Sequence, residues 1–247
     1  MRVKHGGLAA AFLVALAVAT VLAVGTWGRS FWVPAYRTVV GDRTVADVMA
    51  EYGEPATKRL AARFEAAGLH YPPSEVALVG LKSEMRLELW APAGGAWRHV
   101  ADYAVTAASG VAGPKLHEGD RQVPEGLYRI VGLNPNSRYH LSMKLDYPNA
   151  FDRRHAARDG RAHPGSDIFI HGKAVSVGCL AVGDAAIEEL FVLAASVGKD
   201  NVAVVIAPFD GRRTPVLPPP EGLPPWTPEL YRLIGEALER YSRPTSA

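Results

Sequence analysis

The chain has 247 residues, of which 48% are hydrophobic and 21% are charged, a composition typical of a folded protein and not of a disordered one. Lys and Arg number 27 and Asp and Glu number 25, so the formal charge of +2 creates no strong field of the kind that marks nucleic-acid-binding proteins. The single cysteine, Cys179, excludes an internal disulfide, a cysteine-rich zinc module and an iron–sulfur cluster held by cysteines of this chain alone.

The chain begins with a membrane-targeting segment. Residues 8–24 form an uncharged run of 17 residues behind a positively charged flank. As a helix this run would be about 26 Å long, slightly shorter than the hydrocarbon core of about 30 Å. We predict a signal peptide or transmembrane anchor over residues 1–30, with Trp27 and Trp32 favouring an anchor in the inner membrane and a buried core helix as the alternative. The positive flank predicts that the rest of the chain is extracytoplasmic, in the periplasm.

A helical N-terminal extension is predicted over residues 31–75. Thr44 is a suitable N-cap for a helix within residues 42–69, whose apolar side chains recur on one face. The prolines Pro72 and Pro73 close this region.

The body of the chain, residues 76–209, is predicted to be mostly β. Short apolar or alternating runs between turn residues predict strands over 76–81, 86–90, 97–105, 127–133, 140–145, 167–171 and 202–208. One helix interrupts them, with Asp184 as its candidate N-cap and Gly198 at its end. Its apolar stripe predicts packing on the sheet.

Two segments follow the body. Residues 210–226 are rich in proline, which favours an extended linker, with recognition by a proline-reading domain as the alternative. Residues 227–247 are predicted to form a C-terminal helix, with Thr227 as its cap and Pro228 at its first position. The apolar face of that helix predicts docking on the body.

The residues that carry chemistry are a histidine and the cysteine. An apolar strand delivers His171 at its end, and Cys179 follows after a short loop. An imidazole within hydrogen-bond reach can hold a thiol as a thiolate and later return the proton to a leaving group, so the pair suits acyl transfer. Gly178 permits a tight turn that aims the N–H groups of Gly178 and Cys179 at an oxyanion, and the Gly172 carbonyl is free to orient the imidazole.

Other interpretations of these residues remain open. Cys179 can be a small buried hydrophobe, and His171 can be a hydrogen-bonded residue of the core. A metal site on the pair would need further ligands, and no Asp or Glu stands at a recognisable spacing. We therefore expect no metal and no cofactor.

The motif around these residues resembles that of a known family. The His-Gly at 171–172, followed by Ser-Val-Gly-Cys at 176–179, resembles the active-site signature of the YkuD-type L,D-transpeptidases, in particular their YafK-like murein branch. The stretch 119–128, with its Val-Pro-Glu-Gly turn, and the stretch 141–149 resemble family segments that precede the active-site loop. The resemblance extends from about residue 76 to residue 208.

The resemblance implies an L,D-transpeptidase-type β-sandwich with one packed α-helix, to which the two helical extensions are added. It implies Cys179 as the nucleophile, His171 as the general base and acid, and the two glycines in the roles just described. Val177 stands where many members have a second histidine, and Ala181 where an arginine is common. Both departures leave substrate recognition open.

A carboxylate of the substrate would then be held by another cation. Candidates by charge alone are Arg138, Lys144, Arg153 and Arg154, with solvated surface charge as the alternative for each. The substrate-binding set that we predict is Ser176, Lys144, Tyr147 and Arg153. For Tyr147 and the nearby His140 a structural role is the favoured interpretation.

The predicted function is that of a cysteine-dependent peptidoglycan L,D-transpeptidase, which acts on diaminopimelate-containing stem peptides through a thioester acyl-enzyme. A murein amidase or peptidase with water as the acceptor, and a non-catalytic wall-binding protein, are the alternatives. The expected partners are peptidoglycan stem peptides and, through the N-terminal segment, the membrane, with no nucleic acid.

Overall fold

The computed structural model describes residues 42–212 and 222–242. The leader predicted over residues 1–30 and residues 213–221 of the proline-rich linker lie outside the described residues. Within the described ranges, no helix combines the length and the apolar character needed to cross a bilayer.

The first described helix is α3, Val45–Ala66, which confirms the helix predicted in this region. Thr44 is its N-cap, as predicted: its hydroxyl accepts the Asp47 N–H, and the Asp47 carboxylate accepts the Thr44 N–H. This reciprocal capping box satisfies two backbone donors at the start of the helix. The helix packs on α5, Asp184–Val197, where the buried Glu189 pairs with two arginines of α3.

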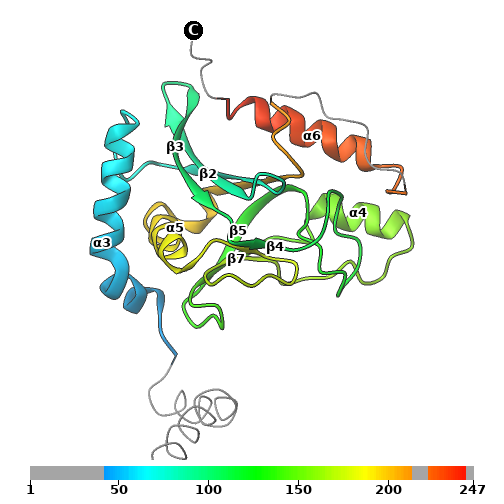
Figure 1. Ribbon diagram of the computed structural model, residues 1–247, viewed down its shortest axis with the longest axis horizontal. Helices are drawn as coiled ribbons and strands as arrows, with labels where there is room; N and C mark the ends of the chain where they lie inside the picture. Colours follow the sequence, from blue (N-terminus) through cyan, green and yellow to red (C-terminus); the bar gives the residue numbers. More distant parts are fainter. Residues whose placement is uncertain (1–41, 213–221, 243–247) are drawn as a thin grey trace, which may run out of the picture. The chain divides into compact units, whose positions relative to one another are not determined.

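The described residues contain nine strands in one curled sheet, which confirms the mostly β class (Figure 1). Their order is β3-β2-β1-β9-β5-β6-β7-β8-β4. The bounds are β1 Val76–Leu81, β2 Arg86–Ala93, β3 Ala96–Ala104, β4 Ala107–Ala108, β5 Gly126–Asn134, β6 Ser142–Leu145, β7 Phe169–His171, β8 Leu180–Ala181 and β9 Val202–Ala207.

Strand β9 lies between strands from much earlier in the chain. It runs parallel to β1 and antiparallel to β5. Side chains alternate across a strand, and here Val202, Val204 and Ile206 enter one hydrophobic cluster while Val205 and Ala207 enter another. An apolar run without polar alternation is typical of a strand covered on both faces.

Two predicted strands are shorter in the structure. The runs over 140–145 and 167–171 become β6 and β7, which begin two residues later. His140 and Asp167 have φ angles of +76° and +56°, which lie outside the extended region, so neither residue can join a strand. The two-residue strands β4 and β8 were not predicted, because so short a segment carries no periodicity.

Helix α4, Ala150–Arg158, was also not predicted. Its sequence is rich in charged residues and has little apolar periodicity, but Asn149 caps it by accepting the N–H groups of Phe151 and Asp152. The cap signal was therefore present in the sequence, while the apolar stripe was not.

The packing of α5 on the sheet is confirmed, whereas its predicted cap is wrong. The N-cap is Gly183, and Asp184 is the first residue of the helix. The Asp184 carboxylate accepts instead from the backbone N–H and the ammonium group of Lys173, at 2.8 and 2.6 Å. The cap residue has φ +80°, a conformation that favours glycine. The short 3-10 helix η1, Lys199–Asn201, connects α5 to β9.

Helix α6, Thr227–Glu239, docks on β5 and β9, as its apolar face predicted (Figure 1). Its N-cap is Trp226, so the prediction of Thr227 as the cap is wrong by one residue, and Pro228 stands second. The Thr227 hydroxyl donates to the Pro224 carbonyl instead.

Arg212 links the end of this C-terminal region to the sheet through hydrogen bonds. Arg212 donates to both carboxylate oxygens of Glu88, which is fully buried on β2, and to the backbone carbonyl of Tyr241. This ion pair compensates part of the desolvation cost of the buried Glu88 carboxylate.

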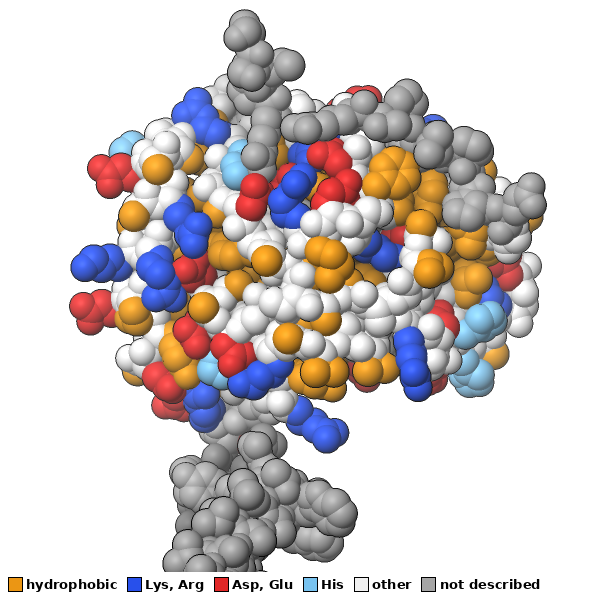
Figure 2. Space-filling view, viewed as in Figure 1, with side chains coloured by type: hydrophobic (Ala, Val, Ile, Leu, Met, Phe, Trp, Pro, Cys, Tyr) orange, Lys and Arg blue, Asp and Glu red, His pale blue; other side chains and the backbone are white. Residues whose placement is uncertain are grey.

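The surface mixes both signs of charge. On the face drawn in Figure 2, Lys and Arg side chains alternate with Asp and Glu side chains, as the formal charge of +2 leads one to expect.

Candidate active site

His171 is the last residue of β7 and is almost fully buried, with 1% of its surface exposed. Its Nδ1 lies 2.6 Å from the carbonyl oxygen of Gly172. A carbonyl only accepts, so Nδ1 carries the proton and Nε2 is the basic nitrogen of the neutral ring. The ring of Tyr139 stacks on the imidazole with centroids 4.5 Å apart. No pattern in the sequence indicates this contact.

Cys179 directly precedes β8, which pairs in parallel with β7. Ile170 lies opposite Leu180, and His171 lies opposite Ala181. Because side chains alternate along each strand, continuing this register by one residue puts Cys179 on the same face of the sheet as His171, two positions back along the strand. The topology therefore places both sequence-predicted residues on one face of the sheet, on neighbouring strands.

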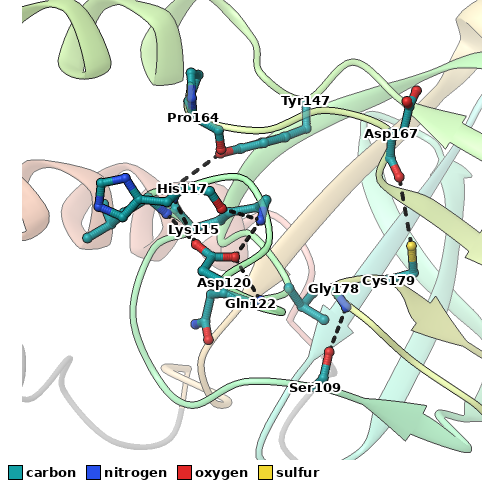
Figure 3. A network of polar contacts seen from close by, with 12 residues as sticks. Ser109, Lys115, His117, Asp120, Gln122, Tyr147, Pro164, Asp167, Gly178 and Cys179 are labelled. Atoms are coloured by element: carbon teal, nitrogen blue, oxygen red, sulfur yellow. Dashed lines mark hydrogen bonds and ion pairs between the residues drawn. The ribbon is translucent and has the colours of Figure 1, made fainter. Parts of the chain in front are cut away.

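The thiol has a backbone partner. Its Sγ lies 3.9 Å from the carbonyl oxygen of Asp167 (Figure 3). Among the described residues, the His171 imidazole is not a hydrogen-bond partner of this sulfur. Cys179 is half-buried.

Burial shifts the pKa of both Cys179 and His171. It raises the pKa of the Cys179 thiol, against smaller opposing effects of the Phe169 N–H and the Lys115 charge. Burial also lowers the pKa of His171, more than its hydrogen bond to Gly172 raises it. Each shift favours the neutral form. Both shifts act against a preformed thiolate–imidazolium pair, and the activation of the thiol by the imidazole stays a prediction.

The turn that leads to the cysteine is fixed by two serines. The Ser176 hydroxyl donates to the Cys179 carbonyl at 2.6 Å. The Gly178 N–H donates to the Ser109 hydroxyl oxygen at 2.6 Å (Figure 3). Gly178 has φ +95°, so the turn uses the conformational freedom of glycine. The N–H of Gly178 is therefore engaged, which corrects the expectation that it is free to face an oxyanion.

A second polar cluster lies beside the cysteine in Figure 3. The buried ammonium group of Lys115 forms an ion pair with Asp120, whose carboxylate also accepts the N–H groups of Leu116, His117 and Gln122. These bonds shape the loop that follows β4. Nothing in the local sequence pattern relates this lysine to the cysteine, so its place beside the site was not predicted.

Lys144, one of the predicted substrate-binding residues, lies next to the site. It is paired with Phe169 in the strand register, and its ammonium group donates to the Asp167 carboxylate at 2.6 Å. Asp167 is the residue whose carbonyl accepts from the thiol. Both charged side chains of the pair are exposed, and an exposed ion pair contributes little to stability.

The other predicted substrate-binding residues have structural contacts. Tyr147 is buried and its hydroxyl donates to the Pro164 carbonyl at 2.8 Å, so its prediction as a substrate contact is corrected, in agreement with the favoured structural interpretation. Ser176 belongs to the turn described above. Arg153 donates to the Pro148 carbonyl and lines a groove of about 460 Å³ between α4 and residues 161–166. His140 lies 2.8 Å from a Glu188 carboxylate oxygen, as a structural residue would.

Metal ligands do not gather in the described part of the chain: it contains no group of three or more His, Cys, Asp or Glu side chains that could hold an ion.

One family model and one curated relative match more than half of the chain. The model of a family described as the YkuD L,D-transpeptidase catalytic domain matches residues 76–216. The Escherichia coli K12 protein named "Putative L,D-transpeptidase YafK" is 36% identical over 141 residues, which are 55% of this chain and 55% of that protein. The chain thus spans about half the length of this curated relative.

Two solved structures are also similar. The helical cell shape determining protein Pgp2 from Campylobacter jejuni has a TM-score of 0.44 and 23% identity over 53% of this chain and 47% of its own. Bd1075 from Bdellovibrio bacteriovorus has a TM-score of 0.41 and 19% identity over 68% of this chain and 55% of its own.

Proposed function

The chain belongs to the YkuD family of L,D-transpeptidase catalytic domains, and we propose from this that it is a cysteine-dependent peptidoglycan L,D-transpeptidase. The proposed substrate is a stem peptide that contains diaminopimelate, and the proposed intermediate is a thioester on Cys179. The observation that carries the proposal is the shared face of His171, the last residue of β7, and Cys179, the residue before the neighbouring parallel strand β8.

In the proposed first step, Cys179 attacks the carbonyl carbon of the diaminopimelate residue. Nε2 of His171 takes the proton from the sulfur as the S–C bond forms, and it returns this proton to the amine that leaves when the peptide bond breaks. In the second step, the amine of another stem attacks the thioester, and its proton passes through His171 to the departing sulfur. The lowered pKa of His171 supports this order, because the base must be free to receive the proton.

The oxyanion of each tetrahedral intermediate needs N–H donors. We assign this role to the backbone N–H of Cys179, since the Gly178 N–H is engaged by Ser109. The hydrogen bond to the Gly172 carbonyl supports the role of His171, because it fixes the tautomer in a way that a triad carboxylate does elsewhere.

Water is the alternative acceptor. With water the same site would act as a murein amidase or peptidase. A non-catalytic wall-binding protein would hold stem peptides at this site without cleaving them. The N-terminal segment and the peptidoglycan substrate together support an extracytoplasmic location, in the periplasm, with the leader as signal peptide or membrane anchor.

The muropeptides of purified sacculi, separated before and after incubation with the protein, test the proposal. New cross-linked muropeptides are expected with the wild-type protein and none with Cys179→Ser, which should have the same unfolding midpoint. Release of stem fragments without new cross-links would assign water as the acceptor. Unchanged muropeptides with the wild-type protein would overturn the proposed enzymatic function.

A further inference from the structure

We propose that Ser109 is a positioning residue for Cys179, acting through Ser176 and the Gly178 N–H to fix the turn that carries the sulfur. The inference rests on the proposed function for its catalytic consequence. Its structural part, that this hydroxyl holds the turn, stands on the contacts alone.

The direction of every hydrogen bond in this cluster is determined. The Cys179 carbonyl only accepts, so the Ser176 hydroxyl gives its proton to that carbonyl at 2.6 Å. Ser176 Oγ must then accept from the Ser109 hydroxyl, 3.1 Å away, and it also accepts the Ser109 N–H at 3.2 Å. The Gly178 N–H can only donate, and it does so to Ser109 Oγ at 2.6 Å. Both hydroxyl protons and both hydroxyl oxygens are thus used in one hydrogen-bonded circuit. It consists of Ser109, Ser176, Gly178 and Cys179.

This circuit restrains the backbone on both sides of the nucleophile. The Gly178 N–H belongs to the peptide group before the Gly178–Cys179 peptide, and the Cys179 carbonyl belongs to the peptide group after it. With both neighbours held, the middle peptide, which carries the Cys179 N–H, has little freedom to rotate. Gly178 adopts φ +95° and has no side chain of its own to restrict it, so the restraint has to come from outside the turn.

Ser109 is itself held in place from two directions. It follows β4, where Ala108 pairs with Leu180, so continuing that antiparallel register brings Ser109 opposite Cys179. Its carbonyl accepts the N–H of Val123 at 3.2 Å. The hydroxyl therefore reaches the turn from a backbone that is fixed independently of it.

Two variants of the same shape test the role. Ser109→Thr keeps the hydroxyl and Ser109→Val removes it, so a difference between them reports the hydroxyl and not the volume. Ser176→Ala and the Ser109→Val/Ser176→Ala double variant complete a double-mutant cycle. Ser83→Ala is the matched control, because Ser83 also donates its hydroxyl to one backbone carbonyl, that of Pro208, but outside the circuit.

The primary readout is hydrogen exchange of the peptide that spans residues 176–181, measured by mass spectrometry. With Ser109→Val we expect about tenfold faster exchange at the Gly178 amide, the equivalent of one net hydrogen bond, and near wild-type exchange with Ser109→Thr and Ser83→Ala. The second readout is turnover of sacculi: kcat should fall about tenfold with KM unchanged, and the two serine substitutions should be non-additive.

The outcomes separate the two proposals. Equal exchange and equal kcat in Ser109→Val and Ser109→Thr would overturn the positioning role, and so would additive effects in the cycle. If the wild-type protein does not turn over sacculi, the proposed function fails, while the exchange comparison still decides whether Ser109 holds the turn.

Discussion

The carbonyl oxygen of Gly172 accepts a hydrogen bond from Nδ1 of His171, the residue before it, at 2.6 Å. Gly172 is at the same time closely enclosed. A methyl group on its Cα would lie 2.7 Å from the Tyr139 carbonyl oxygen and 2.6 Å from an Asp184 carboxylate oxygen. The residue that orients the imidazole therefore has no room for a side chain.

Gly172→Ala is expected to destabilise the fold by about 1–3 kcal/mol, because backbone atoms must move to admit the methyl group. The shift should also displace the carbonyl that holds His171 and lower turnover. Denaturant unfolding measures the first effect. Gly132→Ala is the control, since its nearest neighbour would be Lys144 Cβ at an ordinary 3.6 Å. Equal stability of the two variants would contradict the steric argument.

His171→Gln should lower kcat by about 10²–10⁴, the range associated with general acid–base catalysis. Glutamine retains a donor for the Gly172 carbonyl but has no basic nitrogen. The rate of muropeptide turnover is the measurement. His99→Gln, on the distant strand β3, should leave this rate unchanged. A near-normal rate in His171→Gln would remove the imidazole from the proposed mechanism.

Alkylation of Cys179 should depend on pH in a direction fixed by burial. The raised pKa of the thiol means that its alkylation rate rises to half-maximum above pH 9.0, the ordinary value, and that the urea-unfolded protein reacts at lower pH. The folded state then binds more protons than the unfolded state above pH 9.0, so stability falls as pH rises through that range. A reaction plateau that begins below pH 7 would instead indicate a thiolate–imidazolium pair.

The lowered pKa of His171 makes stability depend on pH in the opposite direction. Below its ordinary value of 6.5 the unfolded chain binds the proton more readily, so stability should decline as pH falls toward the folded-state pKa. Turnover should persist below pH 6.5, because the buried imidazole stays neutral there. His171→Gln, whose side chain does not titrate, removes the contribution of this group to the acid dependence of unfolding.

Lys144→Met tests the predicted substrate contact. The Lys144–Asp167 pair is exposed, so its loss should change stability by less than about 1 kcal/mol. If the ammonium group binds a stem-peptide carboxylate, KM for sacculi fragments should rise about tenfold. Lys199→Met is the matched control, because the Lys199 side chain has the same 41% exposure and also pairs with one aspartate. An unchanged KM would exclude Lys144 from substrate binding.

Arg212→Met should destabilise the protein by about 3 kcal/mol, because the fully buried Glu88 carboxylate loses a partner on each of its oxygens. The midpoint of urea unfolding gives this value. Arg232→Met, which breaks the exposed pair of Arg232 with Glu236 on α6, should cost less than about 0.5 kcal/mol. Similar losses in both variants would mean that Arg212 does not compensate a buried charge.

Local patterns predicted most of the fold. The capping box at Thr44, the helix that ends at Gly198 and the apolar run of β9 all follow from interactions between residues near each other in the sequence. Three of the errors lie where the backbone leaves a regular conformation. The cap of α5 and the starts of β6 and β7 depend on single residues with positive φ, and periodicity does not indicate these.

The sequence by itself determined which two residues carry the proposed chemistry, because His171 and Cys179 stand in one short motif whose spacing is local. Only the tertiary structure decided how they are held and protonated. Ser109 and Ser176 are 67 residues apart, and the burial that raises the pKa of the thiol arises only in the folded chain. Contacts between distant segments and the desolvation that they produce exist only once the chain has folded, so they leave no pattern in the sequence.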